Sequence, residues 1–383
     1  MKKRLLPPLL ALCLLCSGCT GELTFGDFRE IDQLVLAETL GVDRTGKLFT
    51  VSLSAAGEED SLLLKNSAVT LSRALREMQN YTAKKYVYYG HTGNLLLGES
   101  AAGEDFQRCV EFVERDGELR MDTRLFIVRG STAEAAVTAS GGSVEDQLES
   151  LARDMELMGE SRAGSCAEAA EALAERGCTL VAAVTLTEPE NVVAGEKKQL
   201  LLSAGYAVVS GGVLAGWLDT NLSRGANLLM GRPGNDLIEG PDGEGGWFAA
   251  RIMSGRTVFC PQYADGELQS LEVRILLRCA LAELRQPMDL RDGETLRRLE
   301  VGAAEAESWR VAEVLRMSQE MGADFCDLGG GTRRASPFRF DRMRTPWEER
   351  FPDLPITAQV EVRLVHSYEG SADALRSGER AAG

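Results

Sequence analysis

Apolar residues alternate with polar ones, or run together between turn residues, in many short stretches, and this pattern predicts a chain rich in strands. β-branched and aromatic residues are concentrated in the same stretches, as is typical of strands. A hairpin is predicted where two apolar runs flank Ser210, Gly211 and Gly212. The other predicted strands cover residues 47–55, 86–89, 95–97, 124–129, 179–186, 247–259, 268–284 and 356–365.

Turns and amphipathic helices fill the segments between these strands. Turns are predicted at residues 42–46 and 264–266, and residues 231–246, rich in Gly, Asp and Glu, are interpreted as a loop. Helices are indicated where apolar residues recur every three or four positions. The predicted helical faces are Leu71, Ala74, Leu75 and Met78; Phe106, Cys109, Val110 and Val113; and Leu148, Leu151, Ala152 and Met155.

Capping residues indicate where these helices begin and end. Ser67 is predicted to cap the first helix, and two later serines have an acidic residue three positions on, a spacing that resembles a capping box. These pairs, with the glycine that ends the second helix, are Ser143 with Asp146, and Ser165 with Glu168 and Gly177.

The longest predicted helix spans residues 293–321, between the cap Asp292 and Gly322. It carries more apolar side chains than can be left in water, and the last predicted strand also needs a partner for its apolar face. We therefore expect the helix to cover an antiparallel sheet that contains this strand. The apolar positions of the helix are Leu296, Leu299, Val311, Val314 and Leu315.

The first twenty residues have the layout of a secretory signal. Basic residues at positions 2–4 precede an apolar run that is shorter than the ~20 residues of a membrane span. Ser17, Gly18 and Cys19 then place two small residues before a cysteine, which resembles a bacterial lipoprotein signal, although Cys16 stands where that class usually has Leu. By this resemblance Cys19 is the lipidated first residue of the mature chain; the alternative is an ordinary cleaved signal.

Residues 187–199 are polar and contain Pro and Gly, so they are the best candidate for a domain boundary. A chain of 383 residues has room for two or three domains. The predicted division is a signal peptide (1–18), a lipidated N-terminus and linker (19–30), an N-terminal α/β domain (31–195), a C-terminal α+β domain (196–370, divisible into 196–288 and 289–370) and a flexible tail (371–383).

Composition and net charge indicate a globular protein and argue against some partners. The chain is 44% hydrophobic, which is typical of a globular protein, and its net charge is −16. A chain this acidic repels phosphate backbones, so nucleic acid is not expected as a partner. It also gains nothing electrostatically from an anionic membrane surface, so attachment to a membrane must come from the lipid or from a protein partner.

The cysteines and histidines do not predict a metal site or a cofactor. Nine cysteines and two histidines are present, and no C-x-x-C pair occurs among the cysteines after Cys19, so a zinc site is not expected. The sequence leaves open whether the six cysteines of the mature chain form disulfides. They are Cys109, Cys166, Cys178, Cys260, Cys279 and Cys326.

No catalytic residue is predicted either. Gly329–Thr332 lacks the Lys-Ser/Thr pair of a phosphate-binding loop and is interpreted as a plain loop after the long helix. His91 lies between two predicted strands without an identified acid or nucleophile partner, so a turn or strand-edge position is favoured. His366 ends a strand and is a weaker candidate.

Several blocks, taken in order, resemble the Ger(x)C family, the lipoprotein C subunits of spore germinant receptors. No single block is specific, but their order and spacing span nearly the whole mature chain. The blocks are Asp27–Asp32 with Gly41–Asp43; Tyr88–His91 with Leu95–Glu99; Val113–Asp116 with Leu125–Gly130; Gly205–Val208 with Leu214–Leu218; and Gly322–Asp324 with Gly329 and Trp347–Pro352. Gly26 departs from the family pattern, which has a tryptophan there.

This resemblance implies a non-enzymatic, lipid-anchored subunit on the extracytoplasmic face of the spore inner membrane. Family members act with a multi-pass A-type subunit and a transporter-like B-type subunit when nutrients trigger germination. The implied fold is α+β, with mixed and antiparallel sheets covered by helices in one elongated body of two to three domains. No ligand-binding residue carries over from the family, and direct small-molecule binding is left open. Glu348 and Arg350 are expected to tolerate substitution if they are exposed.

The sequence leaves two other classes of function open. The chain could be a lipid-anchored solute-binding protein of a transporter, or an extracytoplasmic hydrolase with an unrecognised site. Ligand-dependent thermal stabilisation would favour the solute binder. Neighbouring genes for A- and B-type proteins would favour the receptor subunit.

Overall fold

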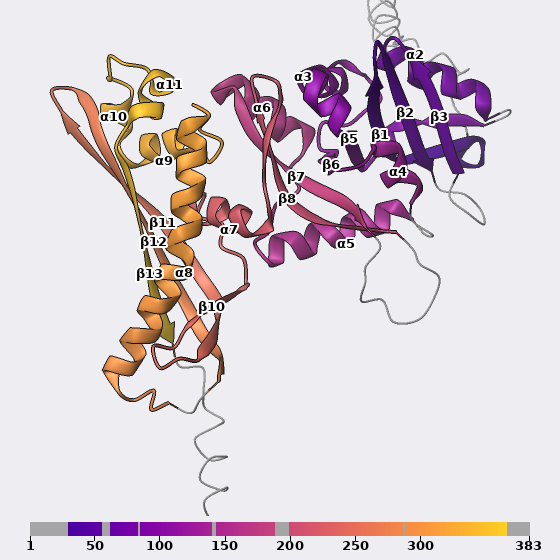
Figure 1. Ribbon diagram of the computed structural model, residues 1–383. Helices are drawn as coiled ribbons and strands as arrows, with labels where there is room; N and C mark the ends of the chain where they lie inside the picture. The colour runs from indigo at the N-terminus through magenta and orange to yellow at the C-terminus, as the bar shows by residue number, and fades with distance from the viewer. Residues whose placement is uncertain are drawn as a thin grey trace, which may run out of the picture.

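The computed structural model describes residues 30–55, 62–82, 85–139, 143–187, 199–285 and 288–365. The predicted signal, Cys19 and His366 lie outside these residues. The described strands form two sheets, which lie side by side in Figure 1, with the second sheet extending away from the first as a long arm.

The first sheet is mixed, in the order β3-β2-β1-β5-β6-β7-β8-β9, with β4 also paired to β1. The central strands pair in parallel and the outer ones antiparallel. Its strands are β1 (Leu34–Thr45), β2 (Leu48–Ala55), β3 (Leu62–Ala68), β4 (Tyr86–Tyr88), β5 (Asn94–Gly98), β6 (Arg124–Arg129), β7 (Cys178–Thr187), β8 (Leu200–Ser210) and β9 (Val213–Leu218).

Helices cover both faces of this sheet. One core lies under α2 (Leu71–Met78), α3 (Glu99–Arg115) and α6 (Cys166–Arg176), and a second core lies under α4 (Ala133–Thr138) and α5 (Val144–Leu157). The short 3-10 turns are η1 (Ile31–Gln33), η2 (Gln79–Tyr81) and η3 (Tyr89–His91). Because both faces are buried, β5 and β6 are almost continuously apolar, as in parallel sheets.

The second sheet has the order β10-β11-β12-β13 and follows α7 (Thr220–Leu229). Its strands are β10 (Leu237–Pro241), β11 (Trp247–Ala264), β12 (Glu267–Leu284) and β13 (Ile356–Val365). The other elements are α8 (Gly293–Glu320), α9 (Leu328–Ala335), α10 (Pro337–Phe340), α11 (Trp347–Arg350) and η4 (Phe351–Asp353).

The predicted packing of the long helix on the last strand is confirmed. Asp292 caps α8 through the amides of Glu294 and Thr295, and α8 packs on β13. Leu299, Val311 and Val314 are fully buried, and Leu315 is 6% exposed. The expectation of an antiparallel sheet is only partly right, since β13 pairs in parallel with β12.

One predicted turn and one predicted helix cap were wrong. Residues 42–45 continue β1, because Val42 pairs with Val51 of β2, and the chain turns only at Gly46 and Lys47. Ser67 lies in β3, and Thr70 is the N-cap of α2, with its hydroxyl accepting the amide of Arg73. In both cases strand pairing extended the strand past a residue with turn or capping propensity.

Two predicted loops contain secondary structure. Residues 231–246 contain β10, which pairs with β11, and Gly329–Thr332 lie inside α9. The ring of Phe259 faces Gly331 so closely that a Cβ there would collide with it. The glycines therefore permit close packing of α9 on β11, which the helix propensity of glycine does not predict.

The predicted domain division stays a prediction. β7 and β8 lie on either side of residues 188–198 and pair antiparallel in one sheet. The predicted hairpin of β8 and β9 is present and extends that same first sheet. The first sheet is thus built from segments on both sides of the proposed boundary.

Candidate functional site

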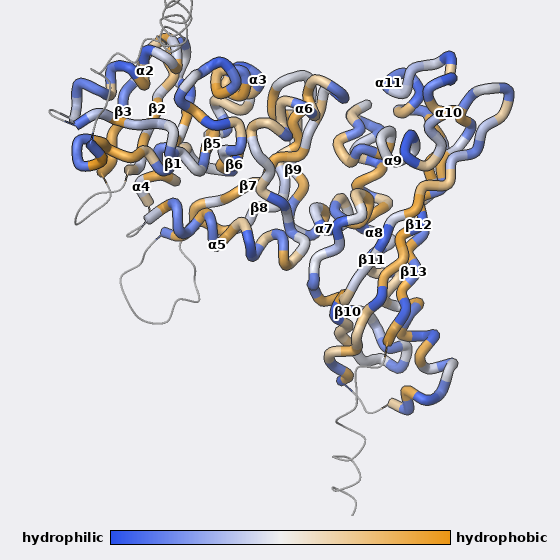
Figure 2. The backbone as a smooth tube through the Cα atoms, turned by 180° about the vertical axis from the view of Figure 1, so that it is seen from behind, coloured by the Kyte–Doolittle hydropathy of each residue, from blue (hydrophilic) through white to orange (hydrophobic). Residues whose placement is uncertain are grey.

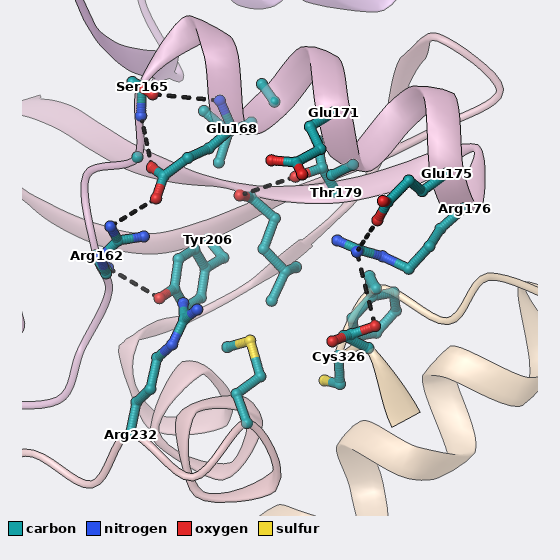
Figure 3. A pocket seen from close by; sticks show the side chains of 18 of the residues that line it. Arg162, Ser165, Glu168, Glu171, Glu175, Arg176, Thr179, Tyr206, Arg232 and Cys326 are labelled. Carbon is teal, nitrogen blue, oxygen red and sulfur yellow. Dashed lines mark hydrogen bonds and ion pairs between the residues drawn. The ribbon is translucent and has the colours of Figure 1, made fainter. Parts of the chain in front are cut away.

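A cleft of about 460 Å³ lies where the first sheet meets the second part of the chain. One wall is α6 with the start of β7, and the facing wall comes from the segment after α7, from β11, from the residues just before α9 and from Arg334 of α9 (Figure 3). Concave sites between domains are common binding sites, so this cleft is the first candidate. Its polar side chains include Arg162, Glu168, Arg176, Tyr206, Arg232 and Asp327.

The capping box predicted for Ser165 and Glu168 forms the start of the α6 wall. The Ser165 hydroxyl accepts the amide of Glu168, and the Glu168 carboxylate accepts the amide of Ser165 at 2.9 Å. Arg162 donates to the same carboxylate at 2.7 Å. Burial raises the pKa of Glu168, but the hydrogen bonds from Arg162 and Ser165 outweigh it and hold the pKa below its usual value. Glu168 is therefore a paired, ionised carboxylate.

Tyr206 on β8 connects three segments at the base of the cleft. Its hydroxyl accepts the amide of Arg162 at 2.8 Å and donates to Asn227 Oδ1 at 2.9 Å. The Asn227 side-chain amide in turn donates to the carbonyl of Gly159 at 2.7 Å. Burial raises the pKa of Tyr206 to about 12, so the phenol stays protonated and acts as a structural connector.

An ion-pair network bridges the two walls. Arg176 at the end of α6 lies 3.7 Å from the carboxylate of Asp327, which precedes α9, and 3.8 Å from Glu175. Arg334 lies 3.2 Å from the same Asp327 carboxylate. Among the described residues, none forms an ion pair with Arg232. The charges of the cleft are thus largely neutralised by one another, and Arg232 is the arginine lining it for which the described residues provide no ion pair.

Behind the cleft, a buried carboxylate holds the C-terminal segment together. Asp324 accepts the amides of Leu328 and Gly329 at 2.8 and 2.7 Å, and the indole N–H of Trp347 at 2.9 Å. Burial raises the pKa of Asp324 to about 6 in spite of these bonds. Because Asp324 already occupies the first amides of α9, those amides cannot form the phosphate cradle that a glycine run can provide.

The six cysteines after Cys19 are free, and all but Cys260 are buried. Burial raises the pKa of Cys178, beside the cleft, to about 11 and the pKa of Cys109 and Cys166 to about 12. These thiols are therefore protonated and inert at neutral pH. Cys260 is partly exposed on β11.

The other sequence candidates do not converge on the cleft. His91 lies in the turn η3 and is exposed, as expected, and His366 and Cys19 lie outside the described residues. Asp43, from an early motif, accepts the amides of Ala133 and Glu134 at 2.9 and 2.8 Å and so fixes the start of α4. Within the described ranges no group of three or more His, Cys, Asp or Glu residues could hold a metal ion.

The contact between the two blocks near the end of the chain was not predicted from the sequence. Asp324 and Trp347 belong to separate blocks of the closing signature, and the structure joins them by a hydrogen bond. The Arg176–Asp327 bridge was not predicted either. The spacing of the signature was a signal for the first of these contacts, but nothing in the sequence indicated the second.

The fold is that of an α+β protein with two sheets. The polar side chains of the cleft connect the two parts of the chain. The family described as "Spore germination protein N-terminal domain" matches residues 27–186, and the family described as "Spore germination B3/GerAC like, C-terminal" matches residues 204–368. The chain belongs to the Ger(x)C spore germination family, as predicted, and this is not a known enzyme family.

A solved structure supports the fold. The structure titled "Crystal Structure of the GerBC protein" is similar to this chain with a TM-score of 0.58 and 17% identity, over 85% of this chain and 96% of that one. The α+β class is therefore confirmed. No curated protein matches the chain.

Proposed function

We propose that the chain is a lipid-anchored, non-enzymatic C subunit of a nutrient germinant receptor. It acts through contacts with the multi-pass A-type and transporter-like B-type subunits at the extracytoplasmic face of the spore inner membrane. The observation that carries this proposal is the match of both family models, in order, over residues 27–186 and 204–368. The similarity to the GerBC structure over most of both chains supports it.

Recovery of receptor subunits from membranes tests the proposal. A tagged full-length chain, extracted in mild detergent from spore membranes, should bring down the A- and B-type subunits. A tagged, unrelated lipoprotein from the same membranes is the control. Absence of both subunits from the eluate of the tagged chain would count against the receptor function.

Lipidation at Cys19 is the proposed means of attachment, supported by Ser17-Gly18-Cys19 at the end of the signal. None of the helices in the described ranges is long and apolar enough to cross a membrane. Metabolic labelling with a radioactive fatty acid should mark the wild type and not Cys19→Ala. Cys13→Ala, which removes a cysteine earlier in the signal, is the matched control and should keep its label. Equal labelling of wild type and Cys19→Ala would refute the anchor.

Solute binding is the second candidate, and the cleft is the observation that favours it. Arg232 has no ion pair among the described residues, and the buried Nε of Arg176 has no hydrogen-bond partner there, so these donors suit a carboxylate-bearing solute. Thermal melts with amino acids would show ~2.7 kcal/mol of stabilisation at a hundredfold excess over Kd. Stabilisation that disappears in Arg232→Ala would establish this function, whereas the receptor proposal predicts no shift with free nutrients.

A further inference from the structure

Among the elements that the structure describes, helices cover one face of the second sheet and leave the other face open. Leu271, Val273, Ile275 and Leu277 of β12 belong to the core under α7, α8 and α9. The residues that alternate with them point the other way, as strand geometry requires. In Figure 2, which shows the molecule from behind, β11, β12 and β13 accordingly carry both orange and blue positions.

The strand register places arginines together on the helix-free face. We call this surface the outer face, and it is made of Arg251, Ser254, Arg256, Val258 and Cys260 of β11, Glu272, Arg274, Leu276, Arg278 and Ala280 of β12, and Thr357, Gln359, Glu361 and Arg363 of β13. Five of these fourteen residues are arginines and two are glutamates, although the chain as a whole has a net charge of −16.

Two of the arginines lie directly opposite each other. Arg278 of β12 is the register partner of Arg363 of β13, so two like charges lie side by side and repel each other. Arg363 lies 3.7 Å from Glu300, and Arg274 is bound by Glu272 at 2.8 and 2.9 Å. No described residue forms an ion pair with Arg251, Arg256 or Arg278.

Apolar side chains lie among these charges. Val258 is the register partner of Arg274, and Leu276 is the register partner of both Arg256 and Glu361. Val258 is 37% exposed, although it lies in the middle of a long strand. An apolar centre surrounded by arginines is typical of protein–protein interfaces, where Arg is enriched.

We propose that the outer face is a docking surface for an acidic protein surface, one that presents carboxylates around an apolar patch. Arginine forms two parallel hydrogen bonds with a carboxylate, so Arg251, Arg256 and Arg278 would find in such a partner the anions they lack here. A second copy docking symmetrically would oppose arginine to arginine. An anionic bilayer would be repelled by Glu272 and Glu361 on this face and by the net charge of −16 of the whole chain. The proposal rests on the proposed function because the receptor supplies the partner.

Cys260 provides a native probe of the outer face. It is the one partly exposed thiol among the six after Cys19, and it is paired in register with Glu272. Maleimide should modify Cys260 in the purified chain and at least tenfold more slowly in isolated spore membranes. A cysteine introduced at the exposed position Arg153 of α5 should react equally in both. Equal modification of Cys260 in both preparations would overturn the proposal.

Charge reversal tests the chemistry of the contact. Arg256→Glu/Arg278→Glu should reduce the recovery of A- and B-type subunits at least tenfold. Its Tm should be unchanged or higher, because the carboxylate introduced at position 278 would face Arg363. Arg153→Glu/Arg297→Glu, which reverses two exposed arginines elsewhere, should leave recovery within twofold of wild type. Full recovery with the outer-face variant would overturn the proposal.

The remaining outcomes separate this proposal from the proposed function. If Cys260 is protected in membranes and the wild type recovers neither subunit, the receptor function fails, while the docking surface stands with another acidic protein. If vesicles of phosphatidylcholine and phosphatidylglycerol protect Cys260 of the purified chain, and phosphatidylcholine vesicles do not, the outer face binds anionic lipid and the proposal is overturned.

Discussion

The two sheets of this protein differ in how helices cover their faces. The first sheet is covered by helices on both faces, so that Leu96 and Phe126 belong to one core and Leu97 and Ile127 to the other. The described helices cover only one face of the second sheet, and its outer face carries charged residues. A sheet with helices on both faces has neither face accessible to a partner protein. A sheet with one open, basic face can bind a partner through that face.

The largest expected effect comes from a substitution in the core of the first sheet, which helices cover on both faces. Phe126 lies on the central strand β6 and is fully buried. Phe126→Ala should lower the free energy of unfolding by ~3–5 kcal/mol, because the cavity on a covered face cannot collapse toward solvent. Urea unfolding of the mature chain measures this loss of unfolding free energy. A loss below ~1 kcal/mol would mean that the first sheet is not covered on both faces.

The second prediction compares the two faces of the open sheet. Leu315→Ala, on the helix that covers the inner face, should cost ~2–5 kcal/mol because Leu315 is only 6% exposed. Leu276→Ala is the matched control on the outer face and should cost less than ~1.5 kcal/mol. Equal losses for the two variants would show that something covers the outer face in the isolated chain.

The third prediction concerns pH. The pKa of Asp324 is about 6 in the folded chain against an ordinary value of 3.8. Between these pH values the folded state keeps a proton that the unfolded state releases, so stability falls as pH rises through this window, by on the order of 3 kcal/mol. In Asp324→Asn this pH dependence should disappear, although the variant is less stable at every pH because Asn replaces an acceptor of three N–H groups. A stability difference between the two proteins that is the same at pH 4 and pH 7 would contradict the assignment.

The smallest expected effect is a difference in stability between substitutions of Arg350 and Glu348, two nearby charged residues of the closing signature. Arg350 is half-buried and donates through Nε and Nη2 to the carbonyl of Leu268 at 2.9 and 2.6 Å, so the exposure on which its expected tolerance depends is not met. Arg350→Ala should cost ~1 kcal/mol. Exposed Glu348→Ala should stay within ~0.5 kcal/mol. Thermal melts that rank Glu348→Ala as the worse variant would refute this contact.

The sequence predicts local features of this fold well and long-range ones poorly. The cap Asp292, the capping box of Ser165 and the apolar face of α3 follow from spacing within one helix. The parallel pairing of β13 with β12 joins residues about 85 positions apart in the chain, and no local pattern encodes it.

The candidate surfaces show the same limit. The charges of the cleft come from α6 and from the start of α9, and their pairing depends on how the two parts of the chain meet. The outer face is likewise invisible in the sequence, because its arginines come from three strands and become neighbours only through the register. Arg278 and Arg363 are ordinary strand residues until β12 and β13 pair.

Hydrogen–deuterium exchange on the full-length lipoprotein, alone and within the purified receptor, tests the central claim most directly. We predict that assembly slows exchange in β11, β12 and β13 and leaves β5 and β6, which are already buried, unchanged. Slower exchange confined to α2 and α5, or no change in any segment, would contradict the account of a receptor subunit that docks through the open face of its second sheet.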